Sequence, residues 1–121
     1  MKTSRVNLSF IFEDICHGDQ AKLLVYLGRI KSGMNRYHDV IPELIREGDF
    51  EAIRTQSHTL KTYLKYISCD SGVHVMTAME QFATKGDTAN LRLTYTGQFA
   101  PIQLEVNTML DREIRHLETG K

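Results

Sequence analysis

Apolar residues recur along most of this sequence at alternating steps of three and four residues. This spacing places them on one face of an α-helix. The clearest series runs from residue 23 to residue 44 and consists of Leu23, Leu27, Ile30, Met34, Tyr37, Ile41 and Leu44. Similar series predict helices over about 50–67, 73–83 and 88–117. Gly-Asp pairs at 18–19, 48–49 and 86–87 separate the segments, as expected where glycine ends one helix and aspartate caps the next.

Three local features modify this pattern. Pro42 should bend the long helix, and Pro101 should kink or break the last one. Residues 6–12 alternate like a strand, but an isolated strand would have no partner, so we expect a short capping helix at about 9–16. Short connections favour antiparallel neighbours. The predicted fold class is therefore all-α, an antiparallel up-down-up-down four-helix bundle with a short N-terminal capping helix, in one domain over 1–121.

Composition narrows the possible functions. The 121 residues are 41% hydrophobic and 25% charged, which is typical of one soluble globular domain. Fifteen basic and fifteen acidic residues give no net charge, which argues against a nucleic-acid-binding protein. No apolar run approaches the roughly 20 residues of a membrane span. Cys16 and Cys69 are too few for a disulfide framework, so we expect a reducing, cytoplasmic setting.

The predicted helix over 50–67 carries the most distinctive polar cluster. On a helical projection, His58 lies roughly 140° from the centre of the apolar stripe, so it should face water. Arg54, Lys61, Thr62 and Lys65 project within roughly 60° of it. The helix thus presents one histidine beside three cations.

The stretch from Ser57 to Lys61 reads SHTLK. It resembles the H-x-L-K phosphorylation signature of the histidine-containing phosphotransfer (HPt) domain family. Residues 15–19 resemble the segment before that family's first long helix, and residues 44–54 resemble its turn into the histidine-bearing helix. The resemblance covers about residues 10–117. It implies a four-helix bundle with a short extra helix.

The resemblance also implies a function. A phosphorylated aspartate on the receiver domain of a response regulator or a hybrid sensor histidine kinase would pass its phosphoryl group to His58. The reaction would then reverse toward another receiver. Lys61 would assist electrostatically, while Arg54, Thr62 and Lys65 would form the docking rim. Such a chain is a phosphocarrier in a two-component phosphorelay and not an enzyme with its own turnover. It needs no cofactor and no metal, because the metal ion belongs to the receiver.

Two positions depart from the family pattern. The family usually has glycine directly after the lysine, where this chain has Thr62, and a small residue one turn later, where it has Lys65. One alternative is therefore a degenerate adaptor that binds receivers without being phosphorylated. Another is a helical enzyme or metal protein of another class, although Glu113 and His116 supply only part of a di-iron motif. The predicted docking surface also includes apolar, exposed parts of the first long helix and the histidine helix.

Overall fold

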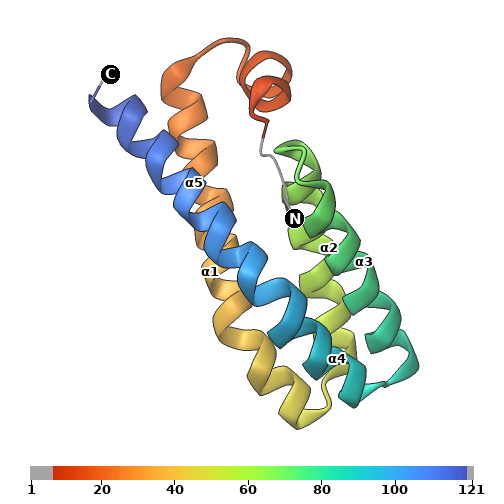
Figure 1. Cartoon of the computed structure of the whole chain (residues 1–121). Helices are drawn as coiled ribbons and strands as arrows, with labels where there is room; N and C mark the ends of the chain where they lie inside the picture. The colour runs from red at the N-terminus through yellow and green to blue at the C-terminus, as the bar shows by residue number, and fades with distance from the viewer. Residues whose placement is uncertain (1–6, 120–121) are drawn as a thin grey trace.

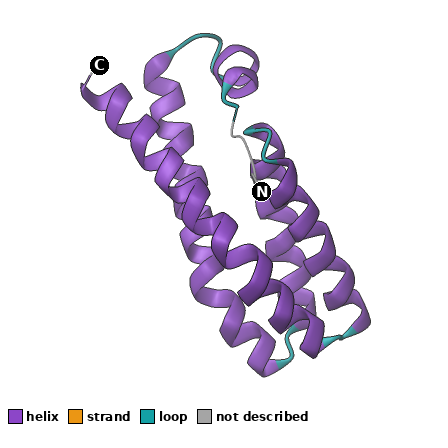
Figure 2. Ribbon diagram, viewed as in Figure 1, coloured by secondary structure: helices purple, strands orange, loops and turns teal. Residues whose placement is uncertain are grey.

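The computed structural model describes residues 7–119, and this part of the chain is helical with no strand (Figures 1 and 2). The all-α fold class is confirmed at this level. Figure 1 shows α5 lying along α1, and α2 beside α3. The elements in chain order are a π-helical turn at Ile11–Ile15, α1 at Gln20–Glu47, α2 at Phe50–Tyr66, α3 at Asp70–Lys85, α4 at Thr88–Thr94, a second π-helical turn at Tyr95–Phe99, and α5 at Ala100–Thr119.

The Gly-Asp pairs end and begin helices as predicted. Gly48 and Gly86 end α1 and α3 with φ of 71° and 65°. Glycine adopts this left-handed conformation at little energetic cost because it has no Cβ atom. The carboxylates of Asp19, Asp49 and Asp87 each accept a hydrogen bond from backbone amides in the first turn of the following helix. These caps fix where α1, α2 and α4 start.

The apolar stripes form one core. In α1 the buried positions agree with the prediction up to Ile41, but Leu44 is only half-buried and Ile45 takes its place. A helix with 3.6 residues per turn drifts against a seven-residue repeat, so the buried face moves by one position near the end of a long helix. In the last segment, Ile114 and Leu117 pack at the edge of the core and are half-buried.

Neither proline interrupts the helical structure of the chain. Pro42 lies within the continuous helix α1. The chain stays helical through Pro101, and the expected break does not occur. The turn before Pro101 is π-helical instead, with the Ala100 amide donating to the Tyr95 carbonyl. A π-helical turn accommodates an extra residue next to a proline that has no amide hydrogen to donate. The expected helical segment near the N-terminus is confirmed over residues 9–15.

The interface between α2 and α3 has a point of close approach at Gly72. A Cβ atom there would lie 2.9 Å from Leu64 Cδ1 and 3.0 Å from Cys69 Sγ. Both neighbours are themselves buried, so they have little room to move. The absence of a side chain at Gly72 therefore sets how closely the N-terminal part of α3 packs on α2.

Among the described helices, none has the length and apolarity needed to cross a bilayer.

We predict that Gly72→Ala destabilises the protein by about 1–3 kcal/mol, because the added methyl group overpacks the α2–α3 interface. Gly28→Ala in α1 is the matched control, since a Cβ atom at that position would have no neighbour within 4 Å. The control should stabilise the protein by about 0.5–1 kcal/mol through better helix propensity. Urea unfolding followed by circular dichroism measures both changes, and a Gly72→Ala protein as stable as the control would contradict the assignment.

Candidate functional site

The histidine singled out by the sequence lies on the solvent-facing side of α2. The buried face of this helix is formed by Ile53, Ser57, Leu60 and Leu64. His58 lies off this face, and its side chain is 69% exposed. The predicted outward position of the imidazole is therefore correct.

A residue outside the predicted set, Glu80 of α3, contacts this histidine. The Nδ1 atom of His58 lies 3.1 Å from Glu80 Oε2. The other carboxylate oxygen of Glu80 accepts a hydrogen bond from the Lys61 ammonium group. One carboxylate thus joins His58 and Lys61 across the α2–α3 interface. The Glu80 and Lys61 side chains are each only 18% exposed, so water and salt screen this pair less than a surface pair.

The hydrogen bond to Glu80 determines which ring nitrogen is available for chemistry. An ionised carboxylate can only accept hydrogen bonds, so Nδ1 of His58 must carry the proton and donate it. In the neutral imidazole, the lone pair then resides on Nε2. The site therefore offers one oriented nucleophilic or basic nitrogen on an exposed ring, with a lysine one helical turn away.

One feature of the sequence could have pointed to Glu80. Between Val73 and Lys85 it is the single acidic residue, and it directly follows Met79 of the apolar stripe. An acidic residue at the edge of a buried stripe often pairs with a cation on the neighbouring helix. The sequence did not show which helix that neighbour was, so the partner could not be named.

The other predicted site residues share the helix with His58, but the structure does not draw them into this cluster. Arg54 and Lys65 are exposed, and neither forms an ion pair within residues 7–119. Thr62 is half-buried, and its hydroxyl donates to the His58 carbonyl at 3.3 Å. Of the expected set, Lys61 alone is linked to the side chain of His58, through Glu80, whereas Thr62 contacts only its backbone.

A buried polar contact lies directly beneath the site. The Tyr37 and Ser57 hydroxyls are 2.7 Å apart, and both side chains are buried. Burial raises the pKa of Tyr37 far above that of a free phenol, although the bond to Ser57 opposes this effect, so the phenol stays protonated at any ordinary pH. This bond gives Ser57 a partner within an apolar stripe and ties α2 to α1 at the residue before His58.

The expected apolar docking surface does not form on the histidine helix. Among the described residues, the large hydrophobic side chains that are exposed are Phe10, Val25, Leu93 and Leu104, and none of them belongs to α2. The apolar stripe of α2 is buried against α1 and α3. Any partner that approaches His58 therefore meets mostly polar and charged side chains.

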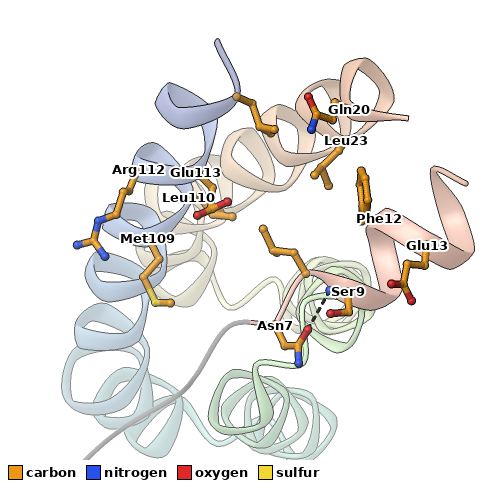
Figure 3. A pocket seen from close by; sticks show the side chains of 12 residues that line it. Asn7, Ser9, Phe12, Glu13, Gln20, Leu23, Met109, Leu110, Arg112 and Glu113 are labelled. Atoms are coloured by element: carbon orange, nitrogen blue, oxygen red, sulfur yellow. Dashed lines mark hydrogen bonds between the residues drawn. The ribbon is translucent and has the colours of Figure 1, made fainter. Parts of the chain in front are cut away.

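A cavity of about 610 Å³ lies between the N-terminal helical segment, the start of α1 and the end of α5. Figure 3 shows the side chains that line it. Phe12, Leu23 and Leu110 line it, and none of the predicted site residues does. Glu113 lies on its wall, but His116 does not line it. Over the part of the chain that the structure describes, no three His, Cys, Asp or Glu side chains are grouped as a metal site would require.

Comparisons with known proteins do not extend this picture: no family model matches the sequence, and neither the curated proteins nor the solved structures include a significant match.

We predict that Glu80 fixes the protonation pattern of the His58 ring. In nitrogen-15 NMR spectra above the titration range of the imidazole, wild-type His58 should carry its proton on Nδ1. Glu80→Ala should shift the population toward the tautomer protonated on Nε2, because no other acceptor of Nδ1–H is present in the described contacts of His58. Glu118→Ala, an exposed acid at the end of α5, should leave the spectrum unchanged. Equal tautomer populations in wild type and Glu80→Ala would refute this role.

Proposed function

We propose that this chain is a histidine phosphotransfer protein of a two-component phosphorelay, with His58 as the residue that accepts and donates the phosphoryl group. The observation that supports this best is the exposed imidazole whose Nδ1 is bonded to Glu80, leaving Nε2 as the nucleophile. The partners are the receiver domains of a response regulator and of a hybrid sensor histidine kinase. The chain acts as a carrier without turnover of its own and requires no cofactor.

In the proposed reaction, the Nε2 lone pair of His58 attacks the phosphorus of an aspartyl phosphate on a receiver. A P–N bond forms while the P–O bond to the aspartate breaks, and the aspartate leaves as a carboxylate. Transfer to a second receiver reverses these bond changes. Because the imidazole is held on a helix by Glu80, less orientational freedom is lost on the way to in-line attack.

Lys61 is suited to stabilise the charge of the transferring group. Its ammonium group has three donors, so it can keep one hydrogen bond to Glu80 and still donate to a phosphoryl oxygen. Hydrogen bonds between a charged donor and a charged acceptor are stronger than neutral ones. Glu80 in turn keeps the ammonium group on the α3 side of His58, and it also stabilises the positive charge that the ring acquires when Nε2 becomes phosphorylated.

The finer architecture belongs to the same proposal. An antiparallel up-down-up-down four-helix bundle with a short N-terminal cap agrees with the order of the contacts between helices. Tyr26 contacts Tyr66 while Tyr37 contacts Ser57, so early residues of α1 meet late residues of α2. The reducing cytoplasm is the compartment that we propose, in keeping with two buried cysteines that are both free thiols.

Phosphorylation of His58 can be tested directly. Each receiver domain encoded in the source genome is phosphorylated with labelled acetyl phosphate and mixed with the chain. We expect at least one receiver to transfer its label to His58, giving a product that is labile in acid and stable in base. His58→Gln should abolish the label while leaving the helical content unchanged, since the side chain is exposed.

Three outcomes would count against the proposal. Label that persists in His58→Gln would mean that another histidine is the acceptor, with His17→Gln and His74→Gln as the controls for exposed positions. A receiver that binds the chain without transferring label would favour the adaptor, in which Thr62 and Lys65 block close approach. Purified protein with stoichiometric iron or zinc would instead support the metal-protein alternative.

Lys61→Ala should slow transfer from the receiver by about 10- to 100-fold, since a hydrogen bond to a charged group contributes roughly 1.5–3 kcal/mol. Lys61→Arg should recover part of the rate. Lys85→Ala, at the exposed end of α3, is the control for loss of one positive charge and should transfer at the wild-type rate. Rapid-quench kinetics measure these rates, and equal rates for Lys61→Ala and wild type would remove the role assigned to Lys61.

A further inference from the structure

The α1–α2 interface contains a cleft that no part of the proposed chemistry uses. Its volume is about 280 Å³. Residues from two consecutive turns of α1 form one wall, and residues of α2 on either side of His58 form the other. The main lining residues are Arg29, Gly33 and Arg36 on α1 with Gln56, Thr59 and Tyr63 on α2.

The cleft lies on the flank of α2 away from Glu80, and His58 itself does not line it. Arg36 directly precedes Tyr37, whose hydroxyl bonds Ser57, the residue before His58. Thr59, the residue after His58, is one of its lining residues. The cleft and the histidine therefore lie at the same level of the bundle, with α3 and Glu80 on one flank of α2 and the two arginines on the other.

The two flanks also differ in charge. On the α3 side, the carboxylate of Glu80 offsets the Lys61 ammonium group. On the α1 side, Arg29 and Arg36 are exposed and form no ion pair with any described residue. Gly33 lies between them, and its missing side chain leaves the floor of the cleft to the Tyr63 ring, 3.5 Å from the position of a Cβ atom. Two guanidinium groups without an ion-pair partner in the described structure thus line a shallow opening at the level of the candidate phosphoacceptor, on the other flank of α2.

We infer that this cleft is a docking subsite for carboxylate side chains on the surface of the phosphorylated receiver, and that Arg29 and Arg36 set the rate and choice of partner. The inference rests on the proposed function. Guanidinium groups bind carboxylates with two parallel hydrogen bonds, which gives geometric as well as electrostatic selectivity. The α2 wall of the cleft exposes no large hydrophobic side chain, so charge pairing is the recognition that we expect to dominate there.

The test compares two double variants with the same change of net charge. Arg29→Glu/Arg36→Glu reverses the charge of the cleft. Arg112→Glu/Arg115→Glu reverses two exposed arginines on α5 that form no ion pair in the described structure, and it serves as the control. Both proteins are labelled by the receiver that phosphorylates the wild type fastest. Both are also labelled by phosphoramidate, a small donor that needs no docking surface.

We expect the cleft variant to lose about ten-fold or more in kcat/KM with the receiver at low salt, and to lose much of that difference at about 0.5 M salt, because steering between charged surfaces is screened. Its labelling by phosphoramidate should equal that of the wild type, which shows an intact His58. The α5 control should behave as the wild type in both assays.

Three results would overturn the inference, and they are distinguishable. A cleft variant that the receiver labels as fast as the control removes the docking role and leaves phosphotransfer standing. Wild-type protein that phosphoramidate labels on His58 but no receiver labels removes the proposed phosphorelay partner, and with it the subsite. Loss of phosphoramidate labelling in the cleft variant would mean that the arginines act on His58 itself and not on docking.

Discussion

The contact on which the candidate site depends is the one between the Glu80 carboxylate and two residues of α2. It fixes the His58 ring by its Nδ1 atom and holds Lys61 one turn away. The bond can form only if α2 and α3 pack in a particular register, and the close approach at Gly72 helps set that register. A detail of helix packing about two turns from Glu80 along α3 thus contributes to the chemistry available at His58.

The exposure of His58 could be predicted from the sequence because it follows from local geometry alone. A helix that must bury Ile53, Ser57, Leu60 and Leu64 turns His58 away from the core, whatever lies across the interface. The bond to Glu80 could not be predicted in this way. It depends on the relative rotation and shift of two helices, and the apolar pattern of each helix constrains these only loosely.

The same distinction explains where the fold departs from expectation. Helix ends at Gly48 and Gly86 were predictable because a left-handed residue followed by a capping aspartate is a local signal. The continuous helical structure at Pro101 was not predictable, because a proline in the sequence does not show whether the turn before it can widen into a π-helical turn. Here it does, and the π-helical turn places Tyr95 and Phe99 in the core, where Phe99 meets the Tyr37 ring. The Tyr37 ring, whose hydroxyl contacts Ser57, is thereby packed against Phe99.

The two flanks of the histidine helix differ in charge, and this difference bears on the direction from which a partner approaches His58. On the α3 side, Glu80 offsets the charge of Lys61, so this flank offers a transferring phosphoryl group the remaining donors of Lys61 but adds little net positive charge for docking. On the α1 side, Arg29 and Arg36 are unpaired within the described chain and Gly33 keeps the cleft open. An aspartyl phosphate is surrounded by the negative charge of its own receiver. The phosphotransfer that we propose therefore favours a partner that approaches over α1, where Arg29 and Arg36 supply positive charge that no described residue pairs.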